Sequence, residues 1–122
     1  PVEELYVLQC TTEYPCPVEL VGVNVCEVYS RNFIFKGGLS DHSGLIYPGI
    51  IAAYLGAAMV EVHVCYHKNQ FGADISSSLT FADFERLTQG VAYANKLREH
   101  PVNKDLYIPP TDAQCYREGK KR

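Results

Sequence analysis

The sequence lacks several features that would place it in a specialised class of protein. No stretch of its 122 residues approaches the roughly 20 consecutive apolar residues that a membrane-spanning helix needs. Its start has no basic segment followed by an apolar one, so we expect no secretory signal peptide. It also has no initiator methionine, and we expect the chain to be part of something longer.

Cysteine spacing and charge exclude further classes. The five cysteines are odd in number and form no Cys-x-x-Cys pair, which argues against a disulfide framework and against a cysteine-rich zinc module. We expect reduced thiols in a cytoplasmic protein, with each cysteine a small buried hydrophobe. The formal net charge is −3 and the one basic run, at residues 120–122, is terminal, so we predict no nucleic-acid partner and no membrane partner.

What remains is the composition of an ordinary folded domain, with 47% hydrophobic and 20% charged residues. Local patterns predict strands at residues 5–10, 34–40 and 59–65, and helices at 18–33, 47–55 and 80–98. We predict a loop at 70–78 and a polar tail without further elements at 99–122. Alternation of strands and helices is typical of parallel strands joined by crossover helices, and it predicts an α/β fold.

Two histidines stand out because of their positions on the predicted strands. Glu61 and His63 share one face of the third strand, and valines occupy the other. Burying an unpaired charge is costly, so this polar face needs a metal ion or a polar pocket. Ser40 and His42 share a face at the end of the second strand. Because α/β proteins bind ligands at the carboxyl ends of parallel strands, His42 and His63 together could hold a divalent cation.

The histidine pair by itself leaves other interpretations open. Its spacing matches no diagnostic motif, and a histidine at a strand end is more often a hydrogen-bonding residue than a ligand. His63 and His67 are spaced as in helical metal motifs, but the alternating pattern places His63 on a strand and argues against that motif. For Asp41 we predict a structural role, in which its carboxylate accepts hydrogen bonds from the following loop.

Three motifs resemble those of the N-acetylneuraminate synthase family, and they follow one another along the chain in the same order as in that family. Residues 38–43 (GLSDHS) resemble its GLSDHT/S motif. Residues 61–74, with E-x-H, K-N and G-A-D, resemble its E-x-H…K-N…G-P-D segment. Residues 9–15 (QCTTEYP) resemble its H-C-T-x-x-Y-P segment. The resemblance extends over residues 5–98.

The resemblance implies a TIM barrel, of which residues 1–98 would form the last three strand–helix units. It also implies an enzyme that condenses phosphoenolpyruvate with an N-acylated amino sugar such as N-acetylmannosamine, with the help of Mn²⁺ or Mg²⁺. The site residues that the resemblance implies are His42 and His63 for the metal and Thr12, Tyr14, Ser40 and Asp74 for the substrates. Departures at Val62, Val64, His67 and Ala73 leave the acceptor sugar unidentified.

Glu61 is assigned from strand parity rather than from the resemblance. It shares a face with His63, so we place it with His42 and His63 in the catalytic set, where it would orient a ligand or bind a neighbouring cation. The alternative is an ion pair of the inner sheet face that takes no part in catalysis.

The short length restricts what the chain can do alone, because three strands cannot close a barrel. Exposed edges and an open inner face predict a homo-oligomer or a chain completed by its remainder. Two hypotheses follow. The chain is part of a synthase, with the isolated piece inactive, or it is a non-catalytic fragment or interaction module derived from that family.

Overall fold

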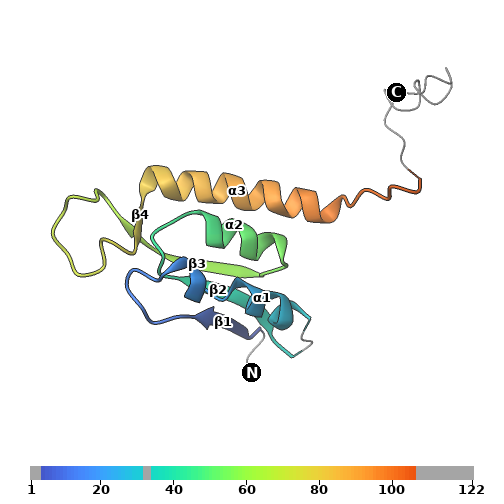
Figure 1. The fold of residues 1–122 in the computed structure, drawn as a ribbon, viewed down its shortest axis with the longest axis horizontal. Helices are drawn as coiled ribbons and strands as arrows, with labels where there is room; N and C mark the ends of the chain where they lie inside the picture. The colour runs from blue at the N-terminus through green and yellow to red at the C-terminus, as the bar shows by residue number, and fades with distance from the viewer. Residues whose placement is uncertain (1–3, 32–33, 107–122) are drawn as a thin grey trace, which may run out of the picture.

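The computed structural model describes residues 4–31 and 34–106, which form a parallel sheet with helices packed against it (Figure 1). The elements are β1 (Tyr6–Cys10), the 3-10 helix η1 (Val18–Leu20), α1 (Val23–Ser30), β2 (Lys36–Asp41), α2 (Tyr47–Tyr54), β3 (Met59–Cys65), β4 (Ser78–Thr80) and α3 (Phe81–Glu99). The strand order is β1-β2-β3-β4, and each neighbouring pair is parallel. The predicted α/β fold is therefore confirmed.

The core lies on the face of the sheet that the helices cover. Leu39 of β2 is fully buried against Cys26 of α1 and Ala52 of α2, and Val60 of β3 packs beside them. Leu39 and Val60 are also register partners. Because successive strand residues point to opposite faces, their neighbours Ser40 and Glu61 lie on the other face of the sheet, which would be the inner face of the barrel that the resemblance implies.

The helix predicted at residues 18–33 is wrong in its first part. Gly22 has φ of 72°, in the left-handed region, and it separates η1 from α1. A side chain at Gly22 would also come within 2.7 Å of Gln9 Nε2, so the chain approaches β1 closely here. A left-handed residue cannot continue an α-helix, and the regular helix begins only after it.

The short strand β4 was not predicted from the sequence. Its three residues were predicted to belong to a loop and a helix cap, but they pair with residues 63–65 of β3 and add a fourth strand. The predicted cap itself is confirmed, because Thr80 Oγ1 accepts a hydrogen bond from the Asp83 amide at 3.2 Å. The Lys68 ammonium donates to the Ser78 carbonyl and ties the preceding loop to this strand.

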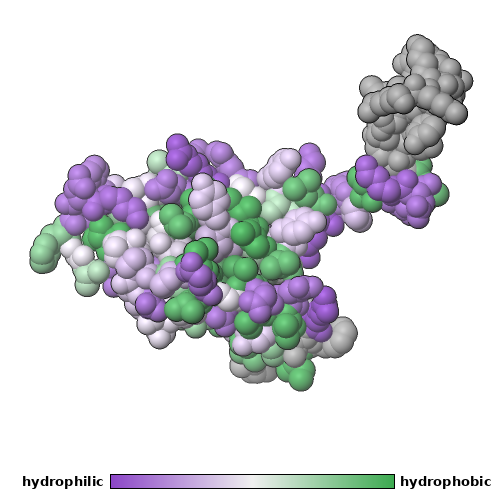
Figure 2. Space-filling model, viewed as in Figure 1, coloured by the Kyte–Doolittle hydropathy of each residue, from purple (hydrophilic) through white to green (hydrophobic). Residues whose placement is uncertain are grey.

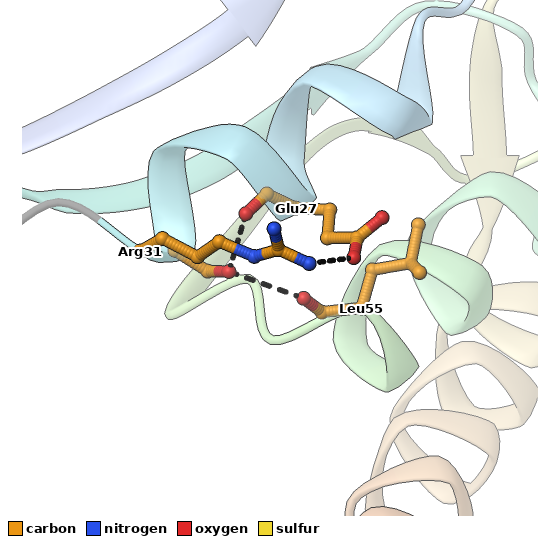
Figure 3. A network of polar contacts seen from close by, with 4 residues as sticks. Glu27, Arg31 and Leu55 are labelled. Carbon is orange, nitrogen blue, oxygen red and sulfur yellow. Dashed lines mark hydrogen bonds and ion pairs between the residues drawn. The ribbon is translucent and has the colours of Figure 1, made fainter.

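A polar network joins the ends of α1 and α2 (Figure 3). The Ser30 hydroxyl lies 2.8 Å from the Glu27 carbonyl and 3.3 Å from the Leu55 carbonyl, both of which accept. Arg31 extends from the same end of α1 and forms an ion pair with the Glu27 carboxylate at 2.5 Å. The pair is exposed and adds little stability, whereas the hydroxyl satisfies carbonyls that helix ends leave free.

Two further expectations can be compared with the structure. Cys10, Cys16, Cys26 and Cys65 have free thiols, as expected, but Cys10 is exposed, so the expectation of burial is wrong there. Cys115 and most of the predicted tail, residues 107–122, lie outside the described residues. Within the described part of the chain, none of the helices has the length and apolarity needed to cross a bilayer.

Candidate active site

Polar side chains converge where β1, β2 and β3 end. His42 directly follows β2, His63 lies near the end of β3, and Tyr14 lies on the loop that follows β1. The ring centroids of His42 and His63 are 5.1 Å apart, and those of Tyr14 and His63 are 5.8 Å apart. The structure thus brings together the two histidines that the sequence analysis paired.

The His42 ring is buried and held by the loop after β1. Its Nδ1 lies 2.9 Å from the Thr11 carbonyl oxygen, which can only accept, so Nδ1 carries the proton of this hydrogen bond. In the neutral ring, Nε2 then has a free lone pair, which faces the Tyr14 hydroxyl at 3.2 Å. The Tyr14 ring stacks on His42 with centroids 4.2 Å apart. The tautomer and the orientation of His42 are therefore both fixed.

Asp74 approaches the other histidine from the loop between β3 and β4. Its Oδ2 lies 3.9 Å from Nδ1 of His63, which is too long for a hydrogen bond. Both side chains are partly exposed, so a bound molecule can reach either. Asp74 belongs to the same cluster although it is eleven residues beyond His63 in the sequence.

Ser40 and Glu61 form a second polar pair on the inner face. The two are register partners on β2 and β3, and the Ser40 hydroxyl donates to Glu61 Oε1 at 2.7 Å. Cys10 is the register partner of Ser40 on its other side. The strand parity that predicted a shared face for Glu61 and His63 is thus consistent with the observed register. Among the described residues, Glu61 has a hydroxyl partner and no ion pair.

Two buried residues, Asp41 and Cys16, lie next to His42. The buried Asp41 carboxylate accepts from the Ser43 amide at 3.1 Å and from the Ser43 hydroxyl at 2.7 Å, as its predicted structural role requires. The Cys16 amide donates to the His42 carbonyl at 2.9 Å. Burial raises the pKa of the Cys16 thiol, and the Asp41 carboxylate raises it further, so Cys16 remains a neutral packing residue.

The remaining predicted residue, Thr12, is exposed on the loop after β1, and no hydrogen bond within the described residues joins its side chain to the cluster. Thr11, which the sequence analysis did not single out, contributes a carbonyl to His42 instead. Every residue type has such a carbonyl, so no sequence signal could have identified it.

A family model described as the NeuB family matches residues 2–102. The chain belongs to the NeuB family. It is 29% identical over 102 residues to the N,N'-diacetyllegionaminic acid synthase of Campylobacter jejuni. This alignment covers 84% of this chain and 30% of that protein. It is 30% identical over 109 residues to the human N-acetylneuraminate-9-phosphate synthase, covering 88% of this chain and 30% of the human protein. The chain thus spans about 30% of the length of these NeuB relatives.

Solved structures show the same fold. The crystal structure of an N-acetylneuraminic acid synthetase from Leptospira borgpetersenii, in complex with citrate, matches 93% of this chain and 39% of that protein, with a TM-score of 0.73 and 20% identity. A spore coat polysaccharide biosynthesis protein of Bacillus subtilis matches 83% of this chain and 30% of that protein, with a TM-score of 0.69 and 27% identity. The chain is therefore part of a TIM barrel of the NeuB type.

The donor set can be compared with the needs of a metal ion. Within residues 4–31 and 34–106, no group of three or more His, Cys, Asp or Glu side chains is arranged to hold one. The described residues would therefore offer a metal ion two imidazole donors, Nε2 of His42 and the ring of His63. Water, substrate or further residues would occupy its other coordination positions. The hydrogen bond from Nδ1 of His42 to the Thr11 carbonyl is of the kind that metal-binding histidines usually form through their second nitrogen.

Proposed function

We propose that this chain carries part of the active site of a nonulosonic acid synthase, which condenses phosphoenolpyruvate with an N-acylated amino sugar such as N-acetylmannosamine. The observation that carries the proposal is the convergence of His42, His63, Tyr14 and Asp74 at the carboxyl edge of the sheet. NeuB relatives named as legionaminic acid and N-acetylneuraminate-9-phosphate synthases support the substrate class.

His42 and His63 would hold the divalent cation, Mn²⁺ or Mg²⁺. When bound, the cation would act as a Lewis acid that polarises the aldehyde oxygen of the sugar. Imidazole nitrogens suit a transition-metal ion better than Mg²⁺, which prefers oxygen ligands, so we expect Mn²⁺ to bind more tightly. The Thr11 carbonyl contributes by keeping the His42 proton on Nδ1.

The other residues would bind and orient the substrates. The Asp74 carboxylate can accept from a sugar hydroxyl, and the Tyr14 hydroxyl can turn from His42 to a substrate oxygen. The Ser40 hydroxyl donates its proton to Glu61. It would therefore accept a hydrogen bond from a substrate, unless the hydrogen bond to Glu61 breaks. Glu61 is accordingly a positioning residue for Ser40. Thr12 would contact substrate from the exposed loop.

The chain described here has an open inner face, so we propose that activity needs a longer protein that also contains the remaining barrel strands, called the complete-barrel form below. Among the described residues, no hydrogen bond or ion pair joins a lysine or arginine side chain to the histidine cluster, and the phosphate and carboxylate of phosphoenolpyruvate need cationic partners. We further propose a cytoplasmic location, in keeping with the free thiols.

The test measures phosphate release from phosphoenolpyruvate by the complete-barrel form, with N-acetylmannosamine and related amino sugars, together with Mn²⁺ binding. His42→Ala and His63→Ala should each weaken Mn²⁺ binding about 10-fold or more and abolish phosphate release. His100→Ala, a change to an exposed histidine at the end of α3, is the matched control and should leave both unchanged. Unchanged phosphate release in both site variants would refute the proposal.

A further inference from the structure

Gln9 is a polar residue on the apolar face of the sheet. It is the register partner of Leu39 on β2, so both side chains lie on the face that the helices cover. Apolar side chains gather over α2 on this side of the molecule, below α3 (Figure 2). Gln9 is only partly exposed, and an amide removed from water needs hydrogen-bond partners. The partners of Gln9 therefore indicate why a polar residue occupies this position.

The Gln9 amide begins a series of hydrogen bonds that closes the loop after β1. Its Nε2 atom donates to the Thr11 hydroxyl at 3.4 Å and to the Val21 carbonyl at 3.5 Å, both long distances. The Thr11 hydroxyl accepts from Gln9 and donates its own proton to the Leu20 carbonyl at 2.7 Å. This short bond joins the two ends of residues 11–20, which we call the 11–20 loop. The amide of Gln9 thus directs the Thr11 proton toward the far end of the loop.

The turn at Gly22 brings the end of this loop against β1. Gly22 has φ of 72° and separates η1 from α1. A Cβ atom there would lie 2.7 Å from Nε2 of Gln9 and 3.3 Å from its Cδ, so the glycine leaves the space that the amide occupies. The two carbonyls that precede the turn, those of Leu20 and Val21, are thereby within reach of the side chains on and after β1.

The 11–20 loop contacts His42 at three points. The Thr11 carbonyl accepts from Nδ1 of the imidazole at 2.9 Å, and the Tyr14 ring stacks on the imidazole. The Cys16 amide donates to the His42 carbonyl at 2.9 Å. Thr11 therefore has two roles, because its side chain closes the loop and its carbonyl holds the imidazole. Opening the loop at Thr11 would displace the carbonyl that sets the tautomer of His42.

We propose that Thr11 and Gln9 are positioning residues for His42, which hold the imidazole proton on Nδ1 and so leave Nε2 free for a metal ion. Thr11 is the stronger support because its bond is short, and Gln9 acts through the Thr11 hydroxyl. Partners of metal-binding histidines commonly fix the tautomer and the ring orientation, and here two side chains hold that partner in place. The metal-binding part rests on the proposed function, whereas the tautomer is a property of the metal-free chain.

The first experiment uses the metal-free chain at mildly alkaline pH, where imidazole is ordinarily neutral. Long-range ¹H–¹⁵N NMR spectra of the histidine rings show which nitrogen carries the proton. His42 should carry it on Nδ1 in the wild type and in Thr11→Ser, which keeps the hydroxyl. Thr11→Val should move much of the population to the Nε2–H form. Thr88→Val is the matched control, because it removes a hydroxyl that donates to a backbone carbonyl of α3 at 2.8 Å, and should leave His42 unchanged.

Mn²⁺ affinity of the same proteins separates the positioning role from the proposed function. Thr11→Val should weaken Mn²⁺ binding about 10-fold, and Thr11→Ser and Thr88→Val should bind like the wild type. A wild type that binds no Mn²⁺ would refute the proposed metal site, and the NMR spectra would still decide the positioning role. An unchanged His42 tautomer in Thr11→Val, or an equal change in Thr11→Ser, overturns the proposal. Mn²⁺ affinity that stays the same despite a changed tautomer also overturns it.

Gln9→Leu decides the case if Thr11→Val fails to fold. It keeps Thr11 and removes only the donor that orients the hydroxyl, so it should shift the His42 tautomer in the same direction by a smaller amount. Gln89→Leu is its matched control, because Nε2 of Gln89 also donates at 3.4 Å, to the Glu85 carboxylate on the surface of α3. Identical His42 spectra for Gln9→Leu and Gln89→Leu overturn the proposal.

Discussion

Tyr14 touches His42 in two ways, and substitutions can separate them. Its ring stacks on the imidazole, and its hydroxyl faces Nε2 at 3.2 Å. We predict that Tyr14→Phe keeps Mn²⁺ affinity or increases it, because it removes the group that competes for Nε2. Tyr14→Ala should weaken Mn²⁺ binding, because the imidazole loses its stacking partner. Titration of the chain with Mn²⁺, followed by electron paramagnetic resonance, measures both.

The comparison also separates metal binding from substrate binding. In the complete-barrel form, Tyr14→Phe should raise KM for the amino sugar if the hydroxyl turns to the substrate as proposed. A Tyr14→Phe variant that lost Mn²⁺ binding as completely as Tyr14→Ala would contradict the assignment of Nε2 as the ligating atom.

Ser40 and Glu61 act as a unit in the proposed mechanism, and their hydrogen bond of 2.7 Å makes the coupling testable. We predict that Ser40→Ala and Glu61→Ala each lower kcat in the complete-barrel form. The double variant should be no worse than the more damaged single variant, because either change already breaks the same interaction. Steady-state kinetics of the four proteins give the coupling energy. Strictly additive losses would show two independent roles.

The helix cap at Thr80 is the clearest prediction at the scale of elements. Thr80→Ala should lower the free energy of unfolding by about 1 kcal/mol, because the first turn of α3 loses its side-chain acceptor. Thr80→Ser keeps the oxygen and serves as the control. Urea denaturation at neutral pH measures the difference. A loss as large in the serine variant would assign the effect to the methyl group instead.

The same cap has a defined pH dependence. The Thr80 hydroxyl donates to the Asp83 carboxylate and holds the pKa of that group below its ordinary value of 3.8. A carboxylate whose pKa is lower in the folded state than in the unfolded state stabilises the fold at pH values above its unfolded-state pKa. This stabilisation is lost as the pH falls through the folded-state pKa. The stability difference between wild type and Thr80→Ala should therefore shrink below pH 3.8. A difference independent of pH would exclude a contribution from Asp83.

Gly44 joins the loop after His42 to the loop before β4. Its φ is 69°, and a Cβ atom there would lie 2.4 Å from the Ser76 carbonyl oxygen. We predict that Gly44→Ala destabilises the chain by about 2 kcal/mol or more, because left-handed strain adds to a backbone clash that cannot relax easily. Gly72→Ala, in a more open loop, is the control. Thermal unfolding compares the two variants.

Regular elements were predictable where the sequence pattern was strong, and the exceptions have physical causes. The alternation at residues 59–65 predicted β3 correctly, and the Thr80 cap predicted the start of α3. The short strand β4 begins at the last of three consecutive serines and has too few residues to show any period. Its strand conformation comes from pairing with β3, which a local pattern cannot express.

The histidine pair was predictable because it depends on strand parity and parallel register. The contacts that other residues make with the two histidines were less predictable. The Thr11 carbonyl and the stacking of Tyr14 on His42 depend on the path of the loop at residues 11–17, which no periodicity constrains. The approach of Asp74 to His63 likewise depends on how the loop between β3 and β4 folds back. Of these residues, only Tyr14 and Asp74 were predicted, and they were predicted from the family motifs alone.

For the whole molecule, the partial barrel explains why the site is chemically incomplete. The two histidines, Tyr14 and Asp74 come from one side of a barrel interior, and the described residues form only four of the eight strands that close a TIM barrel. A bound trianion such as phosphoenolpyruvate needs cations, and the cluster described here offers carboxylates, hydroxyls and imidazoles. The proposed metal binding is therefore to be tested on the chain itself, and the proposed catalysis on the complete-barrel form.

This division gives a prediction about metal removal. Treating the complete-barrel form with a chelator should abolish phosphate release, and Mn²⁺ should restore it at lower concentration than Mg²⁺, because two imidazole ligands favour the transition metal. His42→Ala should need far more Mn²⁺ for recovery, since it lacks one of the two proposed ligands. His100→Ala should recover like the wild type. Phosphate release that persists after chelation, with no metal detected by elemental analysis, would leave the two histidines as hydrogen-bonding residues of the sheet edge.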